Sequence, residues 1–265
     1  MEHDLFPSWP DVAPDLVNVA AGRAFADTVI RGGIWVNVHT RETLPDHDIA
    51  ITKGRIACVV PDASACVGPE TEIIEAKGRY MVPGLCDGHM HVESGVLAPA
   101  EFAAAVLPDG ATARVAERAA TQRAGKTVGG HYASPDLGPD FAAYVAGGPA
   151  DDHEGTVEAD AIARMRQGMR SMIRLGSAWY DVETQITAIT EQGLDPRNMI
   201  LCTDDCHSGT LVNEGHMNRV VGHAIACGGD PLVALLMATS NTATHFGLER
   251  ESGALTPGRR ADVIL

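Results

Sequence analysis

Two histidines one residue apart, His89 and His91, lie in the segment GLCDGHMHVESG at residues 84–95, directly after an apolar stretch that predicts a strand. Alternate residues of a β-strand point to the same face, so both imidazoles can approach one ion while Met90 packs on the other side. Neutral imidazole is a frequent ligand of zinc, iron and manganese. The pair therefore indicates a metal site, although alternating polar residues on a solvated strand give the same pattern.

Three further polar positions follow apolar stretches later in the chain. His131 ends KTVGGH, His153 lies in PADDHEG, and Asp204 with Asp205 closes RNMILCTDD. Each has an ordinary explanation, because single histidines often only make hydrogen bonds and an aspartate after a strand often caps a helix. However, the C-terminal ends of the strands of a β/α barrel meet at one mouth. The joint pattern favours a metal site made by His89, His91, His131, His153 and Asp204.

The elements that must position these residues change in character near residue 81. Before it, short apolar runs with turn signals at Gly32-Gly33 and Lys53-Gly54 predict hairpins of a small antiparallel sheet. After it, apolar strands alternate with stretches of helical periodicity, which predicts β/α units and a parallel sheet. The fold class is therefore α/β, with an incomplete β/α barrel and a small β-sandwich-like domain built from both chain ends.

The predicted domains follow this division. Residues 1–80 form a lead-in and the small β-domain, residues 81–249 form the barrel, and residues 250–265 return to the β-domain. The chain stops within the apolar run ADVIL, so a C-terminal truncation is expected.

Composition excludes several classes of protein. The 265 residues carry a formal net charge of −15, which disfavours binding of nucleic acid through a basic patch. No run approaches the roughly 18 apolar residues of a membrane span. The six cysteines form no C-x-x-C pair, and the acidic, proline-rich start lacks the apolar region of a signal peptide. We expect a cytoplasmic protein with no nucleic-acid or membrane partner. The sequence is compatible with a homo-oligomer.

A string of motifs points to a known family. The segments PGLCDGHMHVESG, GHYAS, DDHEGT, LCTDDCHSGTL and EGHMNRVV, in this order, resemble the adenine deaminases of the amidohydrolase superfamily. NTATHFGLERESGALTPGRRADVIL resembles the closing stretch of that superfamily. The resemblance extends from about residue 26 to residue 265. A rival class of zinc deaminases is excluded, because its P-C-x-x-C signature is absent from the sequence.

The resemblance implies an amidohydrolase-type barrel and a role for each motif residue. It places His89 and His91 on the first barrel strand, His131 and His153 on the fifth and sixth, and Asp204 on the eighth. It makes Asp204 both a metal ligand and the catalytic group that takes the proton of the bound water, and it suggests Glu93 and Asp205 for binding the purine. The implied reaction is hydrolytic deamination of adenine to hypoxanthine and ammonia by metal-activated hydroxide, a step of purine catabolism. The implied cofactor is a divalent metal, Mn²⁺ first, with Fe²⁺ or Zn²⁺ as alternatives.

The spacing of the motifs departs from this pattern. Only 40 residues separate His91 from His131, whereas four β/α units of about 30 residues each should lie between them. We therefore expect units to be missing near residues 110–118, including the glutamate that bridges two metals in the family, and a single helix over Ala111–Ala124. Such a chain should bind at most one metal, weakly. The alternatives are a non-catalytic, metal-poor remnant, or an amidohydrolase acting on another cyclic amidine or amide.

Overall fold

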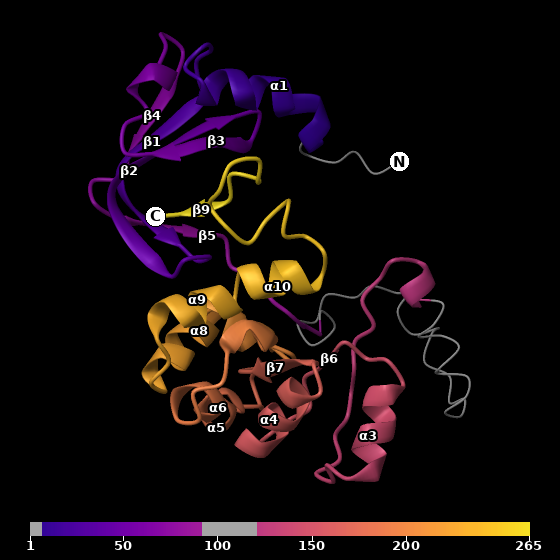
Figure 1. Cartoon of the computed structure of the whole chain (residues 1–265). Coiled ribbons are helices and arrows are strands. Elements are labelled where there is room, and N and C mark those ends of the chain that lie inside the picture. Colours follow the sequence, from indigo (N-terminus) through magenta and orange to yellow (C-terminus); the bar gives the residue numbers. More distant parts are fainter. Residues whose placement is uncertain (1–6, 92–120) are drawn as a thin grey trace. The chain divides into compact units, whose positions relative to one another are not determined.

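The computed structural model describes residues 7–91 and 121–265. It divides the chain into two compact units, one of residues 1–84 with 247–265 and the other of residues 85–246 (Figure 1). We call them the β-unit and the barrel unit. The helix expected over Ala111–Ala124 lies largely outside the described residues, of which 121–123 are helical. The segment 110–118 also lies outside them.

The β-unit is one six-stranded sheet with a helix, α1, drawn in indigo in Figure 1. The strand order is β3-β2-β1-β5-β9, with β4 beside β1. Strand β9, from the end of the chain, pairs antiparallel with β5, so both chain ends contribute to this sheet. The elements are α1 (Trp9–Ala20), β1 (Thr28–Asn37), β2 (Glu42–Thr52), β3 (Arg55–Val60), η1 (Ser64–Cys66), β4 (Glu72–Glu75), β5 (Tyr80–Pro83) and β9 (Val263–Ile264).

One of the two predicted hairpin turns is confirmed and the other is wrong. Lys53 and Gly54 both have positive φ, 53° and 74°, and form the two-residue turn between β2 and β3. Gly32-Gly33 instead lies inside the single strand β1, where the pairing with β2 shifts register. Gly32 has φ 61°, and its N–H donates to the carboxylate of Asp48 at 2.9 Å. The chain therefore bulges at Gly32 and continues in the same direction.

The interior of the β-unit contains a buried arginine. Arg55 is 1% exposed, and its guanidinium donates to Oε2 of Glu251 at 2.7 Å and to the carbonyl of Gly258 at 2.9 Å. Burial raises the pKa of Glu251, but the hydrogen bonds from Arg55 and Arg260 outweigh it and hold that pKa below its usual value. The ion pair therefore ties the C-terminal segment to β3.

We expect Glu251→Gln to lower the free energy of unfolding of the β-unit by about 1–2 kcal/mol at pH 7, since water screens the one-third exposed carboxylate. A lowered pKa stabilises the fold above the unfolded-state pKa, and this stabilisation is lost as the pH falls through the folded-state pKa. The difference from wild type should therefore shrink below about pH 4. Urea titrations between pH 7 and 3 test this, with the exposed Glu70→Gln as control. An equal effect of both variants would contradict it.

The barrel unit is built around three parallel strands in the order β6-β7-β8. Met90 extends this sheet, because it forms a parallel bridge with Asp204 just after β8. The elements are α3 (Pro139–Ala146), β6 (Asp151–Asp152), α4 (Glu158–Arg166), β7 (Arg170–Arg174), α5 (Val182–Gln185), α6 (Thr187–Thr190), η4 (Pro196–Asn198), β8 (Met199–Cys202), α7 (Ser208–Asn213), α8 (Met217–Ala226), α9 (Pro231–Met237) and α10 (Ser240–His245).

One sequence expectation for this unit is wrong. The strand expected to end at His131 is absent, because segment 126–131 makes too few ladder bonds, although the Ala150 N–H donates to the carbonyl of Val128 at 2.8 Å. Further along the chain, the apolar segment 230–247 forms two helices, α9 and α10. At the division, Thr239 leaves the helical region with φ −137° and ψ −87°, and its hydroxyl donates to the carbonyl of Leu235. Side-chain bonds of this kind compete with helical ones.

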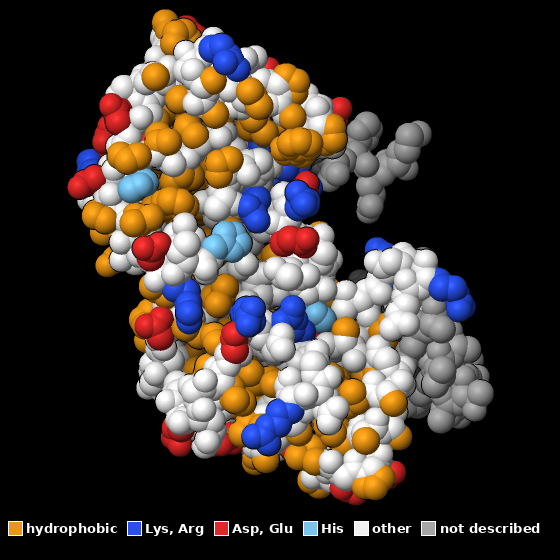
Figure 2. Space-filling view, viewed as in Figure 1, with side chains coloured by type: hydrophobic (Ala, Val, Ile, Leu, Met, Phe, Trp, Pro, Cys, Tyr) orange, Lys and Arg blue, Asp and Glu red, His pale blue; other side chains and the backbone are white. Residues whose placement is uncertain are grey.

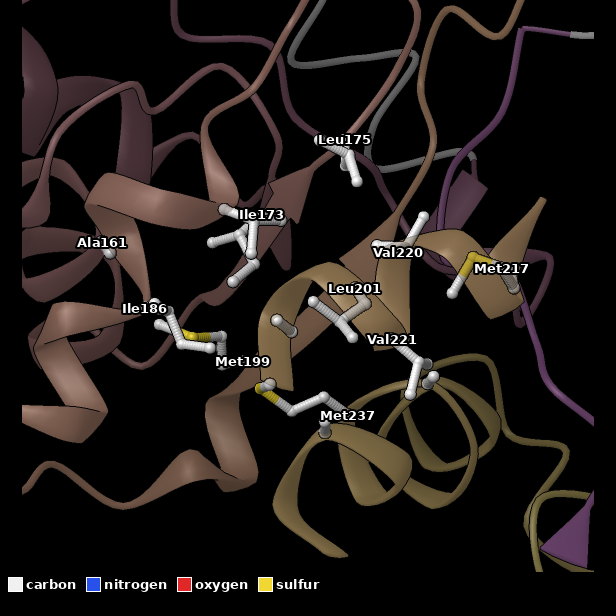
Figure 3. Packing of buried hydrophobic residues seen from close by; sticks show 14 of the residues in the cluster. Ala161, Ile173, Leu175, Ile186, Met199, Leu201, Met217, Val220, Val221 and Met237 are labelled. Carbon is white, nitrogen blue, oxygen red and sulfur yellow. The ribbon is translucent and has the colours of Figure 1, made fainter. Parts of the chain in front are cut away.

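The largest apolar core of the described residues lies between β7, β8 and the helices that follow them (Figure 3). Ile173 of β7 and Leu201 of β8 are fully buried in it with Val220 of α8 and Met237 of α9. The opposite strand face buries Met172 and the residues Ile200 and Cys202. Strands buried on both faces read as continuous apolar runs, as the MILC sequence of β8 does. The core therefore holds the ends of β7 and β8 in place.

The surface shows no separation of charge on the face in view. Acidic and basic side chains are interspersed there (Figure 2), so the acidic excess does not form one patch on that face. None of the helices in the described ranges has the length and apolar character needed to cross a membrane.

Candidate metal centre

A short parallel bridge positions the first three candidate ligands. The N–H of His91 donates to the carbonyl of Asp204, and the N–H of Asp204 donates to the carbonyl of His89, both at 2.9 Å. These bonds fix Met90 between the two histidines against the chain after β8. Asp204 has φ 57°, a left-handed conformation that aspartate adopts more readily than most residues. The bridge thus brings residues more than 100 positions apart in sequence to one place.

Four of the predicted residues form one compact group. Ligand atoms of His89, His91, His153 and Asp204 all lie within 4.8 Å of one another. Oδ1 of Asp204 is 3.4 Å from Nε2 of His89 and 3.2 Å from Nε2 of His91. The rings of His89 and His153 stack with centroids 3.9 Å apart. Three imidazoles and a carboxylate therefore converge, with Asp204 and His153 almost fully buried.

The donor atoms of this group fit a divalent cation. Nε2 of His89 and Oδ1 of Asp204 are buried, and neither makes a hydrogen bond of normal geometry to any of the described residues. Buried polar atoms without a partner are costly, and a bound ion satisfies them. Nitrogen and oxygen donors together suit zinc, iron or manganese. The group therefore has both the composition and the unsatisfied atoms of a metal site.

His131 lies beside this group, in a second cluster with His153 and Glu154. Its Nδ1 is 3.3 Å from Nε2 of His153 and 3.3 Å from Oε1 of Glu154, and its side chain is 68% exposed. Glu154 is a site residue that the sequence did not single out. Its position directly after His153 in DDHEGT is the feature that could have indicated a role in the site.

A buried arginine, also missed from the sequence, connects the carboxylates of the site. Arg174, at the end of β7, is 2% exposed. Its Nη1 lies 2.8 Å from Oδ2 of Asp204 and 3.0 Å from Oε1 of Glu154, and its Nε lies 2.7 Å from Oδ2 of Asp181. The sequence RSMIR of β7 carries no local signal of this role. Arg174 fixes the orientation of one carboxylate in each of the two clusters.

These contacts keep both carboxylates ionised at neutral pH. Burial raises the pKa of Asp204, but the interactions with His89 and Arg174 outweigh it and bring the pKa to about 2. The hydrogen bond with His153, together with the charge of Arg174, lowers the pKa of Glu154 to about 2 against the opposing effect of burial. Ionised carboxylates are the form that binds metal ions.

Other carboxylates hold the backbone around the ligands. Oδ1 of Asp87 accepts the N–H of His89 and the N–H of Thr203, both at 3.1 Å, which ties the two strand ends together. The hydrogen bond with Asp87 raises the pKa of His216, whose Nε2 lies 3.0 Å from Oδ2 of Asp87. The contacts of Asp87 therefore hold the backbone at His89 and at Thr203, the residue before Asp204.

The segment that carries His131 is held in a similar way. The fully buried Asp152 accepts the N–H of Tyr132 at 2.6 Å and the hydroxyl of Tyr144 at 2.8 Å. Arg164 donates to the same carboxylate at 2.8 Å. His131 is therefore positioned by buried neighbours although it is not on a strand.

Asp205 and Glu93 are the two residues predicted to bind a purine. Asp205 follows Asp204, and its main-chain carbonyl accepts the N–H of Ser177 at 2.8 Å. Glu93 lies outside the described residues. Both roles stay predictions.

Comparisons with known proteins agree on one family. Two models, each described as "Amidohydrolase family", match residues 72–147 and 154–265. The chain is 60% identical over 349 residues to the adenine deaminase of Ruegeria sp. (strain TM1040), and equally so to that of Roseobacter denitrificans (strain ATCC 33942 / OCh 114). It is 37% identical over 338 residues to the adenine deaminase of Moorella thermoacetica (strain ATCC 39073 / JCM 9320). The matches cover 100%, 100% and 96% of the chain but only 58%, 58% and 56% of these relatives.

Solved structures support the fold. A structure of molinate hydrolase matches with a TM-score of 0.65 at 13% identity, covering 90% of this chain and 89% of that one. A β-aspartyl dipeptidase from Fervidobacterium islandicum AW-1 matches with a TM-score of 0.64 at 14% identity, covering 89% and 91%. At such low identity the likeness concerns the fold alone, and it confirms the predicted amidohydrolase-type α/β class. The chain belongs to the amidohydrolase family.

Proposed function

We propose that this chain is a metal-dependent hydrolase that deaminates adenine to hypoxanthine and ammonia. The observation that carries the proposal is the group of His89, His91, His153 and Asp204, with its buried unsatisfied donor atoms. The 60% identity to proteins named adenine deaminase supports adenine as the substrate.

The chemistry follows from the donor set. Divalent metal held by His89, His91, His131, His153 and Asp204 would lower the pKa of a coordinated water and so supply a nucleophile at neutral pH. Arg174 engages Oδ2 of Asp204, while Oδ1 faces the histidines. Oδ1 is therefore the atom suited to accept a proton and to return it to a ring nitrogen or to the leaving ammonia.

Mn²⁺ is the proposed metal, with Fe²⁺ and Zn²⁺ as alternatives, because imidazole and carboxylate donors accept all three. Glu93 and Asp205 are the proposed purine-binding residues. A cytoplasmic place in purine catabolism is in keeping with six free cysteines. The proposed function is compatible with a homo-oligomer.

A second candidate is a metal-poor remnant without activity. The length of the alignments supports this candidate. The match to the first relative runs over 349 residues, whereas this chain has 265, a difference of 84. We propose that this difference includes barrel units missing near residues 110–118. Loss of these units would leave strand edges of the barrel unpaired.

An assay of ammonia release decides between the candidates. We expect the protein loaded with Mn²⁺ to convert adenine to hypoxanthine with release of ammonia, and a chelator to reduce the rate to background. Hypoxanthine is measured by chromatography, with dihydrouracil as a cyclic amide control. Metal binding without any turnover would favour the remnant, and turnover of the cyclic amide alone would point to a different amidohydrolase.

A further inference from the structure

We propose that Glu154 supplies the carboxylate of a second cation site, in which His131 and His153 are the other two ligands. The proposal rests on the metal-dependent function proposed above and adds a residue to that site. The spacing of the motifs predicts at most one cation, because the family's bridging glutamate is expected to be missing. Glu154 offers a different carboxylate beside the histidines.

The three donor atoms have the spacing that a metal ion requires. Nδ1 of His131, Nε2 of His153 and Oε1 of Glu154 form a triangle whose three sides are each 3.3 Å. Ligands about 2.1 Å from an ion lie about 3.0 Å apart at octahedral angles and about 3.4 Å apart at tetrahedral angles. The triangle falls between these two values, so one ion can contact all three atoms with little movement of the side chains.

The six donors divide into two sets of three. His153 belongs to both groups, and its Nε2, which lies 3.3 Å from Nδ1 of His131 and from Oε1 of Glu154, has one lone pair and can bind only one ion. Assigned with His131 and Glu154, it leaves His89, His91 and Asp204 as the other set, with Oδ1 of Asp204 at 3.4 and 3.2 Å from the two imidazoles. Three protein ligands with an open position are typical of catalytic metal sites. The stacked rings of His89 and His153 make the two sets neighbours.

Arg174 contacts and orients the carboxylates of both sets. It lies 3.0 Å from Oε1 of Glu154 and 2.8 Å from Oδ2 of Asp204. A carboxylate has about four lone pairs, so the hydrogen bond from Arg174 leaves room for an ion on the same group. Glu154 and His153 are 14% and 6% exposed, while His131 is 68% exposed, which gives the second ion a route from solvent.

Metal stoichiometry tests the assignment without relying on activity. The full chain, stripped of metal, is loaded with Mn²⁺, passed through a desalting column and analysed for ions per chain. We expect two ions in wild type and one in Glu154→Gln. His131→Ala should also bind one, and the substitution removes little packing because the side chain is 68% exposed. Asp181→Asn is the control and should retain two, because it removes another carboxylate partner of Arg174 that belongs to neither set.

Electron paramagnetic resonance gives an independent measurement. Two adjacent Mn²⁺ ions produce an exchange-coupled spectrum, which should be replaced by that of an isolated ion in Glu154→Gln. One ion in wild type, unchanged in Glu154→Gln and His131→Ala, would overturn this inference and leave the proposed function standing. If Asp181→Asn also lost an ion, this inference would again be overturned. The loss would then be explained by a changed position of Arg174 and not by the removal of a metal ligand. No bound ion in wild type would overturn both proposals.

Discussion

Replacement of Arg174 by methionine should lower the free energy of unfolding of the barrel unit by about 3–5 kcal/mol at neutral pH. Methionine fills a similar volume but removes the charge that faces Asp204, Glu154 and Asp181. Arg174 helps to hold the pKa values of Asp204 and Glu154 at about 2, so without it the two carboxylates either repel each other as anions or take up protons, and both outcomes destabilise the fold. A buried charge left without its partner is far more costly than an exposed one.

Urea titration followed by circular dichroism measures this effect. Arg197→Met is the matched control, since Arg197 is 79% exposed and pairs with the half-exposed Asp195. That substitution should change the free energy of unfolding far less than Arg174→Met does, because water screens an exposed ion pair. Saturating Mn²⁺ should restore part of the stability of Arg174→Met, because an ion that binds only the folded state stabilises it. Equal and small losses in the two variants would show that Arg174 does not hold the carboxylates together.

Asp204→Asn should weaken cation binding at the group of His89, His91 and Asp204 by at least about 100-fold. Oδ1 of Asp204 lies 3.2–3.4 Å from both imidazole nitrogens, and the substitution removes the charge of the only carboxylate in this set. Loss of a residue that merely supports a ligand already costs about 10–100-fold in affinity, and loss of the ligand itself should exceed that. An amide oxygen remains, but it is a weaker ligand than a carboxylate.

Competition with a fluorescent chelator measures the affinity for Mn²⁺. Asp205→Asn provides the control, because Asp205 is the adjacent aspartate and belongs to neither candidate ligand group. It should leave the affinity within about twofold of wild type while removing the same formal charge. If Asp205→Asn weakened binding as much as Asp204→Asn, general electrostatics rather than coordination would explain the loss. Retained affinity in Asp204→Asn would remove Asp204 from the site.

Features that depend on neighbours in sequence could be predicted without the structure. The two-residue turn at Lys53-Gly54, the apolar strand that became β8 and the spacing of His89 and His91 follow local rules of backbone conformation and side-chain alternation. The order of the motifs led to the family, which the comparisons confirm. The sequence by itself therefore determined the fold class and named the residues that the structure brings together around Asp204.

Features that depend on partners distant in sequence were decided only by the tertiary structure. The bulge at Gly32 forms because its N–H finds Asp48, 16 residues away, where a hairpin turn fitted the local sequence equally well. Glu154 gains its importance from Arg174, 20 residues later, and Arg174 in turn from Asp204, 30 residues further on. A charged side chain after a strand is normally solvated, and only the parallel packing of β6, β7 and β8 buries these groups against one another. Burial raises the energetic cost of an unpaired charge, so the pairing of acids, arginine and histidines is set by which strand ends become neighbours.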